Sequence, residues 1–115
     1  MTPTPDEILT AHVTAVMQGD IPGILQHYSH DAVLITPLGV LEGRAGVEQF
    51  YTQVLATMPD VELSATSATF GGDALLLLWS AKSPAGTISD GVDTMIFADG
   101  AIRLQTIHFT LQPIS

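Results

Sequence analysis

The stretch "TISDGVDTMIFADGAIRLQTIHF", residues 87–109, contains two β-strand patterns separated by a turn. Runs rich in Thr, Val, Ile and Phe on either side of "ADG" (98–100) are typical of antiparallel strands joined by a hairpin. Upstream, "VELSATSATF" (61–70) and "ALLLLWSAK" (74–82) repeat the pattern at similar spacing. The carboxyl-terminal half of the chain is therefore predicted to form a meander of antiparallel strands.

The amino-terminal half has helical features instead. "TPDE" (4–7) combines a capping threonine, a proline suited to the first helical position and a glutamate that completes a capping box, which predicts a helix over about 5–18. A short helix over about 20–28 and a strand at 32–37 follow, and apolar residues at helical spacing predict a third helix over 43–58. Helices followed by a meander favour an α+β fold, with the helices packed on one face of the sheet.

Composition limits the classes of function. The chain has 115 residues and a net charge of −9 with only three Lys or Arg, so residues 1–115 are expected to form one domain that binds neither nucleic acid nor an anionic membrane. There is no cysteine, which excludes disulfides and Cys-ligated metals. No segment has a transmembrane or signal-peptide pattern, so a cytoplasmic location is expected.

The strand "ALLLLW" (74–79) is apolar on both faces. One face must meet the helices, and we expect the other to meet a second copy of the chain, which predicts a homodimer through the outer sheet face. Alternation along the strand separates Trp79 from Leu78. We expect Leu78 to face inward and Trp79 to face outward, toward the partner.

Two segments carry a family resemblance. "GDIPGILQHYSHDAVLITPLGVLEGRAGVEQFY" (19–51) and "GVDTMIFADGAI" (91–102) resemble the SnoaL-like and ketosteroid isomerase-like branch of the nuclear transport factor 2-like superfamily. The resemblance implies a cone-shaped α+β barrel, in which three N-terminal helices pack in a strongly curved antiparallel sheet around a deep apolar pocket. It also implies a dimer. The same fold carries isomerases, polyketide cyclases, dehydratases, epoxide hydrolases and binding modules, so it does not fix the reaction.

The resemblance singles out two candidate catalytic residues. Asp93 lies within an apolar strand, at the position where ketosteroid isomerases keep a protonated aspartate as an oxyanion-hole donor. His12 lies on the first helix, where those isomerases have a tyrosine, and an imidazole there can act as acid, base or second donor. A structural carboxyl or a core histidine remains the alternative for each.

The base of the isomerases is missing from this chain. They place an aspartate directly before the proline of a "P-x-G" turn, where this chain has Thr36, so steroid isomerisation is not expected. A His12/Asp93 pair leaves acid–base isomerisation, cyclisation or dehydration of a small apolar carbonyl compound. The alternatives are a non-catalytic ligand-binding module and a pure dimerisation module. Arg103 and Asp93 do not reproduce the Asp–Arg–Asp spacing of an epoxide hydrolase.

Pattern and resemblance together predict which residues line the pocket, with ordinary core packing as the alternative reading. Gln105 is the informative member, because an amide within an apolar wall orients a ligand or satisfies a neighbouring polar group. "HYSHD" (27–31) is interpreted as a solvated helix end rather than a metal site, and neither metal nor cofactor is expected. The predicted ligand-binding residues are Thr36, Phe50, Leu76, Leu78, Met95, Gln105, Ile107 and Phe109.

Overall fold

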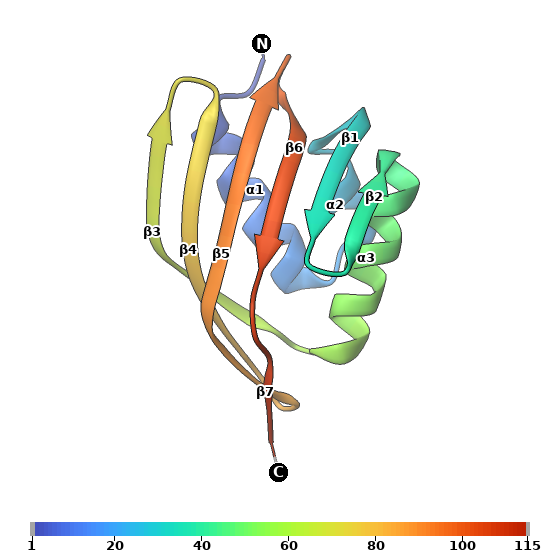
Figure 1. The fold of residues 1–115 in the computed structure, drawn as a ribbon, viewed down its shortest axis with the longest axis vertical. Coiled ribbons are helices and arrows are strands. Elements are labelled where there is room, and N and C mark those ends of the chain that lie inside the picture. Colours follow the sequence, from blue (N-terminus) through green and yellow to red (C-terminus); the bar gives the residue numbers. More distant parts are fainter. Residues whose placement is uncertain (1, 115) are drawn as a thin grey trace.

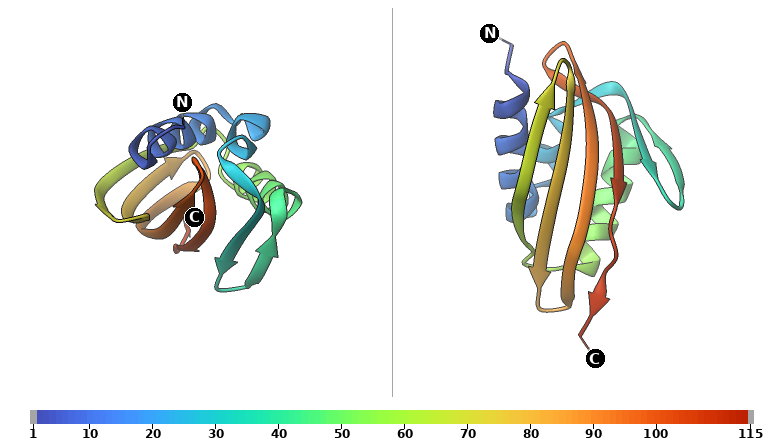
Figure 2. Two further views of the ribbon diagram at one scale, coloured as in Figure 1. Left: turned by 90° about the horizontal axis from the view of Figure 1, so that it is seen from above. Right: turned by 60° about the vertical axis from the view of Figure 1, so that its left-hand side comes forward.

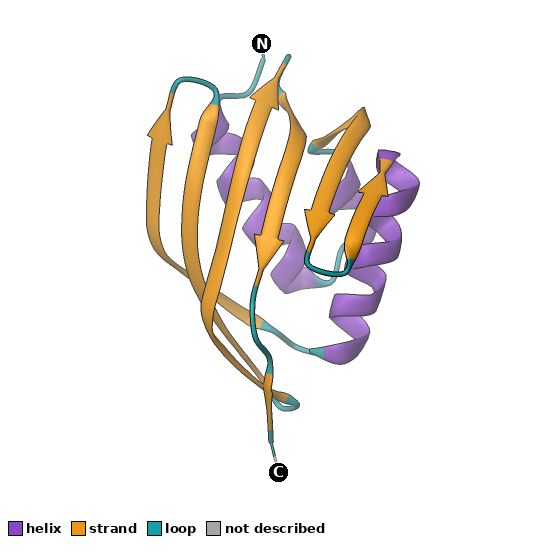
Figure 3. Cartoon of the chain, in the orientation of Figure 1, coloured by secondary structure: helices purple, strands orange, loops and turns teal. Residues whose placement is uncertain are grey.

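A computed structural model describes residues 2–114 and arranges them as helices followed by strands (Figure 1). Colouring by element type shows the helices gathered on one side of the sheet (Figure 3). The elements are α1 (Pro5–Gln18), α2 (Ile21–Leu25), β1 (Tyr28–Thr36), β2 (Gly39–Glu42), α3 (Gly43–Thr57), β3 (Glu62–Gly71), β4 (Ala74–Ser83), β5 (Gly86–Ala98), β6 (Ala101–His108) and β7 (Gln112–Pro113).

Helix α1 has the bounds that its caps predict. The Thr4 hydroxyl accepts a hydrogen bond from the Glu7 amide at 3.3 Å, and the Glu7 carboxylate accepts one from the Thr4 amide at 2.9 Å. This reciprocal pair satisfies two amides that the helix itself leaves without partners. The helix ends at Gly19, whose φ of +65° is the left-handed conformation that glycine adopts at low cost.

The strands form a sheet in the order β2-β1-β6-β5-β4-β3, with β7 added beside β5. The pairs are antiparallel except for β1 and β6, which run parallel. The predicted α+β architecture with a strongly curved sheet is confirmed. Strand β2 was not predicted, because its four residues are too few to show a pattern.

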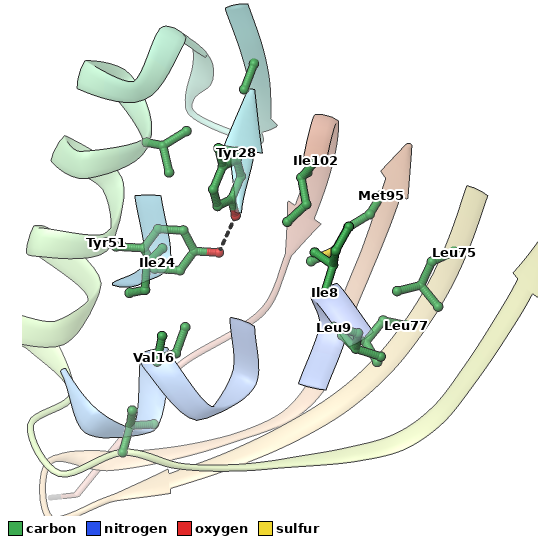
Figure 4. Close-up of a cluster of buried hydrophobic side chains, with 14 of the residues drawn as sticks. Ile8, Leu9, Val16, Ile24, Tyr28, Tyr51, Leu75, Leu77, Met95 and Ile102 are labelled. Carbon is green, nitrogen blue, oxygen red and sulfur yellow. Dashed lines mark hydrogen bonds between the residues drawn. The ribbon is translucent and has the colours of Figure 1, made fainter. Parts of the chain in front are cut away.

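The sheet curls around the helices, as the view from above shows (Figure 2). Pairing register shifts within β3–β4, β4–β5 and β5–β6, and such irregularities bend a strand and increase its twist. Helices α1 and α3 lie on the concave side, where their apolar faces pack against the strands. The buried side chains of this core include Ile8, Leu9, Leu75, Leu77 and Met95 (Figure 4).

Strand β4 corrects one prediction about facing. Leu75, Leu77 and Trp79 face the helices, whereas Leu76 and Leu78 are 46% and 41% exposed on the outer face. The assignment of Leu76 and Leu78 to the pocket and of Trp79 to the outer face was therefore wrong. A strand that is apolar on both faces carries no alternation to show which face is inside, and a shift of one residue reverses every side chain.

None of the helices among residues 2–114 is long and apolar enough to cross a membrane. The cytoplasmic location expected from the sequence stays a prediction.

Candidate functional site

A cavity of about 60 Å³ lies between α1, α3 and the concave face of the sheet. This volume is several times the roughly 10–15 Å³ that one water molecule requires. Its polar lining residues are His12, Tyr51, Trp79 and Asp93. Its apolar lining residues are Val13, Val16, Phe50, Val54, Met58, Val61, Leu63, Ala65, Leu77, Ala81, Ile88, Ile107 and Phe109.

Asp93 is the acidic group of this cavity. Its place on β5 turns the side chain inward, where it is 4% exposed. The Trp79 indole N–H donates to one carboxyl oxygen at 2.9 Å, and the Gln105 amide donates to the other at 2.8 Å. Burial raises the pKa of Asp93 to about 6, while both hydrogen bonds act to lower it. The pKa is raised, as the sequence led us to expect, but at pH 7 the carboxylate predominates over the neutral donor form.

Gly91 allows the indole to reach Asp93. Gly91 on β5 pairs with Trp79 on β4, and a Cβ at position 91 would overlap the indole ring. The missing side chain leaves room for the ring to lie across the neighbouring strand. The glycine therefore belongs to the site through packing, although it carries no chemical group of its own.

A buried hydrogen-bond network connects Asp93 to His12. The Tyr28 hydroxyl donates to the Gln105 carbonyl oxygen, and the Gln105 amide also donates to the Tyr51 hydroxyl at 3.3 Å. The two tyrosine hydroxyls lie 3.1 Å apart (Figure 4). The Tyr51 hydroxyl is 3.2 Å from His12 Nε2. Gln105 and Tyr51 therefore join the candidate acid and the candidate imidazole into one cluster.

His12 is neutral at pH 7. It is 5% exposed, and its ring makes edge contacts with the rings of Tyr28 and Tyr51 at centroid distances of 5.8 and 5.5 Å. Burial, together with a smaller effect of His27 nearby, lowers the pKa of His12 to about 4. Its Nδ1 is buried and has no hydrogen-bond partner among the described residues.

Thr36 does not line the inner cavity. Its hydroxyl donates to the Gly39 carbonyl at 3.2 Å and accepts from the Leu38 amide at 3.1 Å, so it closes the turn between β1 and β2. It lines a separate outer groove of about 740 Å³. Phe50 and Phe109 line both the groove and the inner cavity, which places the groove directly outside the cavity wall.

The predicted site residues divide by location. Gln105 lies behind Asp93 and is fully buried, and Met95 packs in the core without lining the cavity. Sequence reasoning did not single out Tyr28 or Tyr51, and it placed Trp79 on the outer face. The predicted residues that line the cavity are His12, Phe50, Asp93, Ile107 and Phe109.

No group of three or more His, Cys, Asp or Glu side chains within residues 2–114 is placed to hold a metal ion. The "HYSHD" segment (27–31) spans the turn after α2 and the start of β1.

Comparisons with known proteins agree with the architecture. The family model of the SnoaL-like domain matches residues 9–105, whereas no functionally curated protein matches the chain. IdmH from Streptomyces antibioticus, a proposed polyketide cyclase, is 16% identical with a TM-score of 0.83, covering 93% of this chain and 92% of its own. An NTF2-like protein of unknown function from Cytophaga hutchinsonii is 14% identical with a TM-score of 0.79, covering 96% and 93%.

TerC, which was co-crystallised with polyporic acid, is 20% identical with a TM-score of 0.79, covering 91% of this chain and 90% of its own. At these sequence identities the likeness to the solved structures shows the fold alone. The family model extends over most of the chain, from the middle of α1 to the buried glutamine of β6. The chain belongs to the SnoaL-like domain family, within the NTF2-like fold.

Proposed function

We propose that this chain binds a small apolar carbonyl-type molecule in the inner cavity and that Asp93 moves a proton on it as a general base. The reaction would be an isomerisation, a cyclisation or a dehydration. One observation carries the proposal: a buried carboxylate with a pKa of about 6 lies among apolar walls. A base is most effective when its pKa lies near the working pH.

The contacts of Asp93 suit this role. Trp79 and Gln105 hold one carboxyl oxygen each, which fixes the orientation of the group. The carboxylate takes a proton from the substrate, becomes a neutral acid, and returns the proton to another atom. His12, with a pKa of about 4, is a neutral imidazole at pH 7 and not an imidazolium acid, so it supports the network through Tyr51.

Hydrogen–deuterium exchange tests the proposal without knowledge of the natural substrate. Small cyclic ketones with and without a hydroxyl group are incubated with the protein in D₂O, and loss of the α-proton signal is followed by NMR. We expect at least one of them to exchange faster than in buffer, with a rate that rises with pH around 6. The Asp93→Asn variant should lose about 100-fold or more of this rate.

Asp90 supplies a matched control for that experiment. It lies on the same strand three residues earlier, is exposed, and accepts a hydrogen bond from the Thr110 amide. Asp90→Asn should keep the full exchange rate. An Asp93→Asn protein that exchanges as fast as the unmodified chain contradicts the base role.

A non-catalytic binding module is the second candidate. It is favoured by Thr36, because the hydroxyl that stands in place of the isomerase base is engaged in a turn outside the cavity. Such a protein would gain thermal stability from the same ketones, since ligand binding to the folded state raises the melting temperature. It would do so without exchanging their α-protons.

We also propose a homodimer through the outer sheet face. An uncharged row of Leu76, Thr94, Thr106 and Ile35 crosses four strands, and two chains of net charge −9 repel each other least through such a surface. Light scattering should find a dimer that Leu78→Glu converts to a monomer, because a buried unpaired carboxylate is strongly unfavourable.

Leu38→Glu is the matched control for dimerisation, because Leu38 is fully exposed in the β1–β2 turn. This variant should remain dimeric. A monomeric unmodified chain, or a dimeric Leu78→Glu variant, contradicts the proposed interface.

A further inference from the structure

We infer that the molecule that fits the inner cavity presents an O–H donor, as an enol or a phenol does, to Asp93. A bare ketone oxygen would find no side-chain donor there. The inference rests on the proposed ligand site and narrows its carbonyl class. It follows from counting the hydrogens of the polar cluster formed by His12, Tyr28, Tyr51, Trp79, Asp93 and Gln105.

The nitrogen donors beside the carboxylate are already used. The single N–H of the Trp79 indole goes to Asp93, and the two amide hydrogens of Gln105 go to Asp93 and Tyr51. The reversed amide orientation would place the Gln105 oxygen against the carboxylate and its nitrogen against the Tyr28 hydroxyl. Repulsion between the oxygens keeps the amide as it is while Asp93 is ionised.

The hydroxyl hydrogens are used as well. Tyr28 gives its only hydrogen to Gln105, so the contact between Tyr28 and Tyr51 needs the hydrogen of Tyr51. The contact between Tyr51 and His12 then needs a hydrogen on His12 Nε2. This one arrangement satisfies every contact of the network. It leaves His12 Nδ1 without a hydrogen, as a buried acceptor.

The remaining hydrogen-bonding capacity of the cluster is therefore all acceptor. Each oxygen of the Asp93 carboxylate accepts one hydrogen bond and has room for another. Among the described residues that line the cavity, the other side chains are aliphatic, phenylalanine or methionine. A ketone oxygen buried there stays unpaired, whereas an O–H group gains a hydrogen bond to a charged acceptor.

The test compares cyclohexanol with cyclohexanone, which differ little except in the donor. Trp79 is the only tryptophan, so the ¹H–¹⁵N NMR spectrum of ¹⁵N-labelled protein contains one indole N–H signal, and this signal reports on the site. At pH 8, where Asp93 is ionised, cyclohexanol should bind about ten-fold or more tightly than cyclohexanone. At pH 5 the preference should shrink, because a protonated Asp93 can donate to the ketone.

Variants locate the preference. Asp93→Asn should abolish it at pH 8, because the amide offers a donor in place of a charge, whereas Asp90→Asn should leave it unchanged. Equal or tighter binding of cyclohexanone at pH 8 overturns the inference while leaving the base role to be judged by proton exchange. If neither compound moves the Trp79 signal up to its solubility, the cavity is not the ligand site, and the inference and the proposed function both fail.

Discussion

Acidification from pH 7 to pH 4 is expected to destabilise Asp93→Asn relative to the unmodified chain by roughly 2–3 kcal/mol and to stabilise His12→Phe by a similar amount. Asp93 has a pKa of about 6 in the folded state against an ordinary value of 3.8. Between these values the folded state holds a proton that the unfolded state lacks, so acid favours folding. Replacing Asp93 removes this gain.

His12 acts in the opposite direction over nearly the same pH range. Its pKa is about 4 in the folded state against an ordinary value of 6.5. Between these values the unfolded state holds the extra proton, so acid opposes folding. The contributions of Asp93 and His12 to the pH dependence of the unfolding free energy largely cancel in the unmodified chain. Replacing one of the two residues therefore leaves the contribution of the other to be measured.

Urea unfolding of the three proteins at pH 7, 6, 5 and 4 measures both effects as differences, so titrations elsewhere in the chain cancel. Asp90→Asn is the control of opposite sign. The hydrogen bond from the Thr110 amide lowers the pKa of Asp90, so this variant should lose less stability in acid than the unmodified chain. A constant difference between Asp93→Asn and the unmodified chain from pH 7 to pH 4 would mean an ordinary carboxyl and would remove the basis of the proposed base role.

The features that the sequence predicts best are those determined by residues close together in the chain. The bounds of α1 follow from Thr4, Glu7 and Gly19, which lie within or beside the helix and act over a few residues. Asp93 was identified because an acid within an apolar strand is costly unless it has a partner. The inward orientation of Asp93 was expected from its position in the family resemblance, because polar and apolar residues do not alternate along "DTMIF" (93–97).

The facing of β4 and the polar network have no such local signal. Both faces of β4 are apolar, so the sequence does not show that Leu76 points outward and Trp79 points toward the helices. The partners Tyr28 and Gln105 are 77 residues apart, and they meet only because β1 pairs in parallel with β6. The pattern of one strand does not show which distant strand pairs with it, so it does not show which side chains meet.

Gln105→Leu is expected to cost about 3–5 kcal/mol of folding free energy, although leucine is apolar and similar in size. Gln105 is fully buried and contacts Asp93, Tyr28 and Tyr51. Its removal leaves a buried carboxylate with Trp79 as its remaining side-chain donor and leaves two tyrosine hydroxyls short of a partner. Denaturant unfolding at pH 8 measures the cost, and Gln112→Leu on the exposed strand β7 is the control, with an expected change within about 0.5 kcal/mol.

The pH dependence of this cost separates a lost hydrogen bond from simple repacking. The Gln105 amide lowers the pKa of Asp93, so the pKa should rise above its present value of about 6 in Gln105→Leu. The cost should therefore shrink at pH 5, where a neutral carboxyl depends less on the missing donor. Repacking of the core would cost the same at both pH values, because no charge is involved. An equal cost at pH 5 and pH 8 would thus show that Gln105 fills space without stabilising the charge of Asp93. It would contradict the hydrogen bond from the Gln105 amide to Asp93, on which the inference of an O–H ligand depends.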